Sequence, residues 1–351
     1  MNTLLIRADA NTEIGTGHVM RCLALAQAWQ DAGGAVTFAM ATDAPAVRAR
    51  LESEGAHVVS ISESLGSQAD ASRTIALAHE LGARWVVVDG YHFDSGYQRA
   101  VKDAGLALLW IDDEAHAEHY CADIVLNQNL HAAEAMYAAR ESYTRLLLGP
   151  RYVLLRREFL KWRAWQREIP PIARKILVTL GGGDPDNVTL KVIQALKQIE
   201  LEELQVVVLI GATNPHSTEL EATVRNVPFS IRLESNVSDM PKLMAWADVA
   251  VSGAGSTCWE LAFMGLPSIV VTLAENQIAI ARGMRAHGAA VQVETSTLEC
   301  LSEKLKGLVF DAAHRCRMTR KQRLLIEGPG AARTVQALIG SIRNANFIFW
   351  K

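Results

Sequence analysis

Short apolar runs alternate with segments of helical period along the whole chain, a pattern typical of parallel sheets joined by crossover helices. In the first half, this pattern predicts strands over Leu4–Ala8, Ala35–Ala39, His57–Ile61, Trp85–Asp89, Leu106–Ile111 and Ile124–Leu126. In the second half, it predicts strands over Lys175–Leu180, Val206–Ile210, Val249–Ser252 and Ser268–Val271. We therefore expect an α/β protein built from doubly wound, Rossmann-like sheets.

Both halves of the pattern open in the same way, with a strand, a glycine-containing loop and a helix. After His18, apolar residues recur at helical spacing until Gly33-Gly34, where the helix is expected to end. The second opening begins at Lys175, about 170 residues further on, and continues through Gly181-Gly182-Gly183 into another helical stretch. This repetition predicts two domains of similar construction.

A length of 351 residues also favours two domains, because single hydrophobic cores rarely grow that large. The segment Lys161–Pro171 is rich in charge, tryptophan and proline, and it is the predicted linker. We expect an N-terminal domain over 1–160 that carries the catalytic residue, a C-terminal nucleotide-binding domain over 161–335, and a helix end and tail over 336–351. The last predicted helix spans Ala331–Arg343.

The composition of the chain argues against a nucleic-acid-binding or membrane-spanning protein. Hydrophobic residues make up 50% of the chain and charged residues 21%, as in folded globular proteins, and the formal net charge of -3 gives no general attraction to nucleic acid or anionic lipid. No apolar run approaches the length of a membrane span, and the five cysteines form no CxxC pair. We expect a cytoplasmic protein with no nucleic-acid partner and no membrane insertion.

The first candidate site is the loop Asp9–His18, between the first predicted strand and the first predicted helix. Gly15 and Gly17 allow the backbone to approach a ligand, and the start of a helix supplies free N–H groups for anionic oxygen. The helix dipole favours a neutral imidazole at His18, which can accept a proton from water. The alternative is a polar helix cap with an incidental histidine.

A nicotinamide-binding loop is a poor fit to the same segment. Met20 stands where the third glycine of that motif belongs, and no acidic residue ends the second predicted strand at Ala39-Met40-Ala41.

The second candidate site follows the strand Val249–Ser252. Its small residues open a helix and are expected to hold a diphosphate with backbone N–H groups and hydroxyls; they are Gly253, Gly255, Ser256 and Thr257. Glu260, one turn further, is placed to accept both hydroxyls of a ribose. No lysine follows the glycines, so this is not a Walker loop. The alternative is a tight turn with a surface glutamate.

Other polar residues follow strands at the carboxyl edge of the first predicted sheet, where doubly wound folds bind ligands. Tyr91 is a candidate hydrogen-bond partner for a sugar, whereas Asp112 and Asp113 are interpreted as helix or turn caps. His116 and His119 lie close to these aspartates and to Cys121 in the sequence, which raises a metal interpretation. Without a second cluster, solvated loop histidines are preferred and no metal is expected.

These motifs together resemble a known family. Over essentially the whole chain, the sequence resembles the UDP-2,4-diacetamido-2,4,6-trideoxy-β-L-altropyranose hydrolases of pseudaminic acid biosynthesis. The matching stretches are Ile6–Asp9, Glu13–Arg21, Asp89–Tyr91, Leu126–Asn129 and Leu180–Asp184. The second half is also similar to the nucleotide-binding half of the UDP-GlcNAc transferase of peptidoglycan synthesis, through Ser238–Met240, Ala245–Asp248, Gly265–Pro267 and Asn276-Gln277. Both families have the GT-B architecture, with two Rossmann-like domains facing a cleft.

The resemblance implies a UDP-sugar substrate and no cofactor. His18 is then the base that activates water, which attacks the anomeric carbon while UDP leaves with inversion. The residues expected to contact the substrate are Gly15, Gly17, Arg21, Tyr91, Asn276 and Gln277. Glu260 matches the ribose-binding glutamate of both families.

Two other functions stay open. A glycosyltransferase of the same architecture would bind UDP in the same way and admit an acceptor hydroxyl in place of water. A non-catalytic nucleotide-sugar binding protein is the third possibility, and His18 argues against it.

Overall fold

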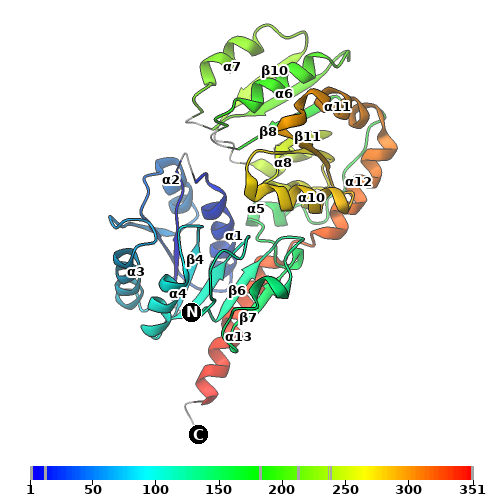
Figure 1. Cartoon of the computed structure of the whole chain (residues 1–351). Helices are drawn as coiled ribbons and strands as arrows, with labels where there is room; N and C mark the ends of the chain where they lie inside the picture. Colours follow the sequence, from blue (N-terminus) through cyan, green and yellow to red (C-terminus); the bar gives the residue numbers. More distant parts are fainter. Residues whose placement is uncertain are drawn as a thin grey trace. The chain divides into compact units, whose positions relative to one another are not determined.

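The computed structural model describes residues 3–11, 14–181, 184–211, 214–235, 237 and 239–348. Several residues that the sequence analysis uses lie outside the described part of the chain: Thr12, Glu13, Gly182, Gly183, Ser238, Phe349 and Trp350. The chain divides into two compact units, which are coloured along the sequence in Figure 1. We call Met1–Arg157 with Gly328–Lys351 the N-terminal unit and Glu158–Glu327 the C-terminal unit.

The N-terminal unit contains a seven-stranded sheet in the order β3-β2-β1-β4-β5-β6-β7, and every neighbouring pair is parallel. Its strands are β1 Leu4–Ala8, β2 Val36–Met40, β3 His57–Ser60, β4 Trp85–Asp89, β5 Ala107–Ile111, β6 Ile124–Asn127 and β7 Arg145–Leu148. Its helices are α1 Gly17–Asp31, α2 Pro45–Ser53, α3 Gln68–Glu80, α4 Ser95–Asp103 and α13 Gly330–Ile348, with short 3-10 turns η1 Glu134–Tyr137 and η2 Pro150–Tyr152. The sheet is wound outward in both directions from the β1/β4 pair, as in the Rossmann fold.

The central strands are apolar throughout because both faces of the sheet are covered. On β1, Leu4 and Ile6 belong to one buried cluster, which includes residues of α1, α2 and α13, whereas Leu5 belongs to a second cluster with residues of α3 and α4. Successive side chains of a strand point to opposite faces, so a strand with two cores loses its polar alternation. This is why the sequence predicts β1 and β4 as continuous runs.

The C-terminal unit contains a six-stranded parallel sheet in the order β10-β9-β8-β11-β12-β13. Its strands are β8 Lys175–Thr179, β9 Gln205–Leu209, β10 Ser230–Glu234, β11 Val249–Gly253, β12 Ser268–Thr272 and β13 Val291–Glu294. Its helices are α5 Arg157–Leu160, which begins at the boundary residue, α6 Val188–Lys197, α7 Ser217–Val224, α8 Met240–Trp246, α9 Thr257–Phe263, α10 Ile278–Ala286, α11 Leu301–Phe310 and α12 Ala312–Leu325, with η3 Glu275–Gln277 and η4 Thr295–Cys300. The expectation of an α/β protein with two doubly wound sheets is confirmed.

Three strands escape the sequence prediction, and all three lie at sheet edges: β7, β10 and β13. Their sequences are RLLL, SIRLE and VQVE, and each has residues that are half-buried or exposed. An edge strand has one neighbour and less cover, so it tolerates the polar residues that hide its signal.

The boundaries between the two units differ from the predicted domain boundaries, which lie between residues 160 and 161 and between residues 335 and 336. The C-terminal unit begins at Glu158 and ends at Glu327, and the red helix α13 returns to the N-terminal unit (Figure 1). The physical reason is that Ala331, Val335 and Leu338 are buried in the same cluster as α1. Among the described residues, every helix is too short or too polar to span a lipid bilayer.

The entry of α13 into the N-terminal unit depends on Gly330. A methyl group at this position would meet backbone, 2.5 Å from the carbonyl carbon of Tyr152 and 2.6 Å from the nitrogen of Val153, and closer still to the oxygen of Val153. Because backbone cannot rotate away as a side chain can, we expect Gly330→Ala to destabilise the N-terminal unit by about 1–3 kcal/mol.

Urea unfolding of the full chain checks this value, with Gly340→Ala as the matched control in the same helix. A methyl group at Gly340 would meet nothing within 4 Å. The control is expected to stabilise by up to about 1 kcal/mol, because alanine favours helix over glycine. Equal stability of Gly330→Ala and the wild type would contradict the packing of α13.

Candidate functional site

His18 is the second residue of α1 and is buried, with 8% of its surface exposed. Its Nδ1 atom lies 2.7 Å from a carboxylate oxygen of Asp89, the last residue of β4. β1 leads into the loop that begins α1, and β4 is its direct neighbour, so the carboxyl ends of these parallel strands place the two residues together. The contact joins residues 71 positions apart in the sequence.

Asp89 is fully buried and accepts hydrogen bonds from one face of α1. Arg21 binds both of its oxygens, with Nε donating to Oδ2 and Nη2 to Oδ1, each at 2.6 Å. The Cys22 thiol donates to Oδ2 at 3.3 Å. His18, Arg21 and Cys22 are three and four residues apart, which is the spacing that puts helical side chains on one face. The helix therefore presents its polar face to a single carboxylate.

A second buried carboxylate extends the network from the end of β5. Arg21 Nη1 donates to Oδ2 of Asp113 at 2.6 Å, and the Tyr91 hydroxyl donates to the same oxygen at 3.1 Å. The amide of Asn129, just after β6, donates to Oδ1 at 2.9 Å. Residues that follow β4, β5 and β6 thus meet at one edge of the sheet.

The Tyr91 ring stands edge-on to the His18 ring, with centroids 4.9 Å apart and an interplanar angle of 83°. Tyr91 is 40% exposed although its hydroxyl is held by Asp113. An aromatic ring beside a buried histidine, partly open to solvent, is a suitable contact surface for a sugar ring.

Two opposing effects act on the pKa of Asp89. Burial alone would raise it, but the charge of Arg21 and the contact with His18 outweigh burial and hold the pKa well below its ordinary value. Burial would likewise lower the pKa of Arg21, and the nearby Asp113 and Asp89 reverse this and raise it. Asp89 is therefore a fixed negative charge, and Arg21 a fixed positive charge, at the working pH of a cell.

This geometry fixes how the imidazole of His18 is used. A carboxylate only accepts hydrogen bonds, so the 2.7 Å contact assigns the proton to Nδ1 and leaves the Nε2 lone pair to accept another. From the sequence, the helix dipole is the one influence expected on the His18 ring. In the structure a full carboxylate charge also lies against the ring and orients it.

The loop before α1 requires Gly15, which has a φ of +75°. Its N–H donates to the carbonyl oxygen of Asn11 at 2.9 Å, and the N–H of Ile14 donates to the Asn11 side chain at 2.6 Å. A methyl group at Gly15 would meet nothing within 4 Å, so the backbone itself demands glycine there. Gly17 is the first residue of α1.

A separate ion cluster secures the end of β1. Arg7 is fully buried and binds both oxygens of Asp70, at 2.9 and 2.8 Å, and it also pairs with Asp9. Asp9 in turn accepts the N–H groups of Ala41 and Thr42, at 2.7 and 3.2 Å. These contacts tie the start of the glycine loop to the end of β2.

In the C-terminal unit, β11 ends at Gly253 and the loop runs into α9. The Gln277 amide oxygen accepts the N–H groups of Ala254 and Leu273, at 3.1 and 3.0 Å, and so fixes the loop. A methyl group at Gly255 would meet nothing within 4 Å, whereas one at Gly253 would lie 3.0 Å from the Leu273 side chain. Gln277 thus holds the loop at Ala254, and the space around Gly255 is open.

The other predicted nucleotide contacts lie on the first turn of α9. Ser256 is the residue before the helix, and its side chain makes no capping hydrogen bond. Thr257 and Glu260 belong to the first turn of the helix and are half-buried. Asn276 is half-buried in η3. The structure thus groups Gly255, Ser256 and Thr257 at one loop, and it shows Gln277 shaping that loop through its amide oxygen. Their roles in binding stay predictions.

The capping interpretation holds for Asp112 and is wrong for Asp113. Asp112 accepts the N–H groups of Glu114 and Ala115, at 2.9 and 3.0 Å. Asp113 instead binds Arg21, which comes from a helix that is distant in the sequence. The position of Asp113 just after β5 could have predicted its place in the site, because β5 is the neighbour of β4, the strand that ends in Asp89. The capping rule considers only nearby residues and does not use this relation between strands.

The chain has two parallel, doubly wound sheets, with polar loops at the carboxyl ends of their strands. This arrangement can be compared with that of known folds. The chain has the GT-B fold: MurG of Acinetobacter baumannii superposes with a TM-score of 0.64 at 17% identity, covering 96% of this chain and 99% of that one. Residues 175–333 match the glycosyltransferase family 28 C-terminal domain, and this range contains the loop at α9.

Among individual proteins, the chain is 25% identical to the UDP-2,4-diacetamido-2,4,6-trideoxy-β-L-altropyranose hydrolase of Campylobacter jejuni, over 82% of this chain and 98% of the hydrolase. It is 27% identical to the spore coat polysaccharide biosynthesis protein SpsG of Bacillus subtilis, over 56% of this chain. The chain spans 58% of the length of SpsG and 56% of an uncharacterized Methanocaldococcus jannaschii relative.

Arg21 is the cation that both buried carboxylates share. Replacing it by methionine leaves Asp89 and Asp113 without their counter-charge, and we expect Arg21→Met to destabilise the N-terminal unit by about 3–5 kcal/mol at neutral pH. Arg73→Met is the control, because Arg73 pairs only with exposed Glu80 in the part of the chain described, and it should change stability by less than about 1 kcal/mol.

The pH dependence of this difference has a definite sign. In the wild type the folded pKa of Asp89 is depressed, so its contribution is present above the ordinary carboxyl pKa and is lost only as the pH falls toward the folded value. Without Arg21, the largest effect that lowers the pKa of Asp89 is lost, and burial favours its protonated form. The destabilisation measured by urea unfolding should therefore shrink between pH 7 and about pH 4. A difference independent of pH would contradict the charge pairing.

Proposed function

We propose that this protein hydrolyses a UDP-linked diacetamido-trideoxy-hexose at the anomeric carbon and releases UDP and free sugar. The observation that carries the proposal is the buried His18–Asp89 pair, in which Asp89 holds one ring nitrogen and leaves the other to accept a proton. Similarity to the Campylobacter jejuni hydrolase over nearly its whole length supports the choice of substrate.

The proposed reaction is a single displacement. Nε2 of His18 takes a proton from water as the water oxygen forms a bond to the anomeric carbon, and the bond between that carbon and the diphosphate oxygen breaks. UDP leaves with the bonding electrons, and the configuration inverts. Asp89 stabilises the imidazolium that forms, because it lies 2.7 Å from Nδ1 and its own pKa is held low.

Arg21 and Asp113 support this pair. Arg21 fixes the orientation of the Asp89 carboxylate through two hydrogen bonds, and Asp113 fixes Arg21 and the Tyr91 hydroxyl. We assign Tyr91 to contact the sugar because its ring is exposed beside His18. Gly15 and Gly17 give the sugar close access to the backbone.

We assign the nucleotide to the C-terminal unit. The loop Gly253–Thr257 offers backbone N–H groups and two hydroxyls to the diphosphate, and Glu260 is assigned to the ribose. The glycosyltransferase family 28 match covers all of these residues, which supports the assignment. Asn276 is assigned to the substrate as well. The loop contains no carboxylate, so the proposal gives no part of the chemistry to a metal ion.

A glycosyltransferase is the second candidate, and the family match together with the GT-B fold favours it. The same His18–Asp89 pair would then take a proton from an acceptor hydroxyl. The two functions differ only in the nucleophile, so an acceptor-free assay separates them.

The decisive experiment incubates the purified protein with a panel of UDP-sugars, without acceptor and with excess EDTA, and measures free UDP and reducing sugar. Rapid release of both products from the diacetamido-trideoxy sugar, and slow release from UDP-GlcNAc, is the expected result. UDP release only after an acceptor is added would establish transfer. Activity that EDTA abolishes, and that Mg²⁺ or Mn²⁺ but not Zn²⁺ restores, would overturn the metal-free mechanism.

We expect His18→Ala to lower kcat by about two to four orders of magnitude, the usual loss for a positioned proton acceptor. Asp89→Asn should lower kcat by about 10–100-fold, with KM nearly unchanged, because it acts on the imidazole and not on the bound sugar. His57→Ala, an exposed histidine on β3, is the matched control. A folded His18→Ala variant with normal turnover would remove His18 from the mechanism.

Glu260→Ala should weaken UDP binding by about tenfold or more, because two hydrogen bonds to a charged group are lost. A ribose contact is equal in the ground and transition states, so kcat at saturation should change little. Calorimetric titration with UDP measures the affinity, and Glu303→Ala on the exposed face of α11 is the control. Unchanged affinity would make Glu260 a surface residue.

A further inference from the structure

A short backbone bridge joins two loops of the N-terminal unit after β5 and before β7. The N–H of Tyr120 donates to the carbonyl oxygen of Ala139, and the N–H of Glu141 donates to the carbonyl oxygen of Tyr120, both at 2.9 Å. Tyr120 and Arg140 pair as an isolated parallel bridge. The segments around Tyr120 and Arg140 therefore lie side by side in a fixed register.

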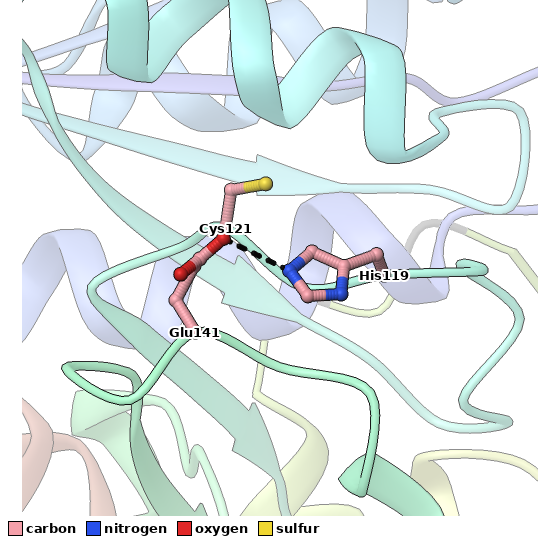
Figure 2. A group of neighbouring side chains, drawn as sticks. All are labelled: His119, Cys121 and Glu141. Carbon is pink, nitrogen blue, oxygen red and sulfur yellow. Dashed lines mark hydrogen bonds and ion pairs between the residues drawn. The ribbon is translucent and has the colours of Figure 1, made fainter.

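This register places three metal-binding side chains together. Tyr120 is buried, and its hydroxyl donates to Asp112 at 2.6 Å, whereas the residues on either side of it, His119 and Cys121, bring their side chains close to Glu141. The ligand atoms of His119, Cys121 and Glu141 all lie within 4.8 Å of one another. Figure 2 shows His119 facing Glu141 with Cys121 beside them, and Nε2 of His119 is 3.1 Å from Oε1 of Glu141.

The backbone of Cys121 is held on both sides. Its N–H donates to the Gln98 amide oxygen at 2.9 Å, and its carbonyl oxygen accepts the Tyr143 hydroxyl at 2.9 Å. The position of the Cys121 backbone is therefore fixed before an ion binds. Glu141 exposes 43% of its side chain and is free to move toward an ion. A site with one rigid and one adjustable ligand loses little entropy on binding.

Burial raises the pKa of the Cys121 thiol. The charges around the thiol are mixed. Two nearby cations, Arg99 and Lys102, lower the pKa of the Cys121 thiol. Two nearby anions, Glu141 and Asp103, raise it. Lys102 is itself paired with Asp123 at 2.6 Å, which offsets its repulsion of a cation.

We propose that His119, Cys121 and Glu141 form a zinc site. Imidazole, thiolate and carboxylate are the three ligand types of protein-bound Zn²⁺, and thiolate with imidazole disfavours Mg²⁺ and Ca²⁺. Tetrahedral bonds of about 2.0–2.3 Å require ligand atoms roughly 3.5 Å apart, a distance that small side-chain rotations reach from the present positions. Three protein ligands leave the fourth position to water.

Binding transfers one proton to solvent, because the Cys121 thiol must become a thiolate as the sulfur–zinc bond forms. The site shares no side chain with the His18 network, although Tyr120 connects it to Asp112, the neighbour of Asp113. The ion would fasten the loop that carries Asp113, and it takes no part in the proposed hydrolysis.

The test uses the full chain without an affinity tag, stripped of metal and titrated with Zn²⁺ by calorimetry and with Co²⁺ by absorption spectroscopy. We expect one ion per chain and an intense near-ultraviolet thiolate-to-cobalt band. Cys121→Ser should abolish that band, and His119→Ala and Glu141→Ala should each weaken zinc binding by about tenfold or more. Cys316→Ser, a half-buried cysteine on α12, should change neither measurement.

His119→Ala keeps the proposal testable if Cys121→Ser fails to fold, because the His119 side chain is 36% exposed. No saturable binding of Zn²⁺ to the folded wild type would overturn the proposal. Cobalt binding without a thiolate band, or a band that survives in folded Cys121→Ser, would overturn it as well. Hydrolase activity is not a readout here, so failure of this site and failure of the proposed function are separate results.

Discussion

The N-terminal unit depends on the pairing of a buried carboxylate at the end of β4. Asp89 has no exposed surface, and a single unpaired carboxylate there would cost several kcal/mol. Arg21 neutralises it through two hydrogen bonds, and His18 occupies the remaining direction. Because α1 supplies both partners, the position of the helix and the orientation of the imidazole are fixed by the same charge. Stability and proposed chemistry therefore share one set of contacts.

Sheet topology makes this pairing possible. β1 and β4 lie at the point where the strand order reverses, so the connections that follow them run to opposite sides of the sheet from neighbouring carboxyl ends. The C-terminal unit repeats the arrangement around β8 and β11, where the loop from Gly253 opens α9. In the first unit the loops offer ionisable side chains, and in the second they offer backbone N–H groups and hydroxyls. On this division rests the proposal that the first unit holds the sugar and the second the diphosphate.

The contacts that hold each loop are made by residues outside it. Gln277, from the segment after β12, accepts N–H groups of the Gly253 loop, and Asn129, from the segment after β6, holds Asp113. Such supports keep the proposed binding groups in place before a ligand arrives, which would lower the entropic cost of binding. Tyr120 has a similar relation to the proposed zinc site, since its hydroxyl donates to Asp112 while its neighbours His119 and Cys121 lie close to Glu141.

Local patterns in the sequence determined most of the fold. The predicted bounds of β1 and β4 coincide with the observed ones, and the glycine loop before His18 was placed between a strand and a helix, because hydrophobic period and turn residues act over a few positions. Only the tertiary structure decided which charges meet. The contacts of His18 with Asp89 and of Arg21 with Asp113 join residues 71 and 92 positions apart. The return of α13 to the first unit was decided in the same way, because burial depends on the whole folded chain and not on neighbours in sequence.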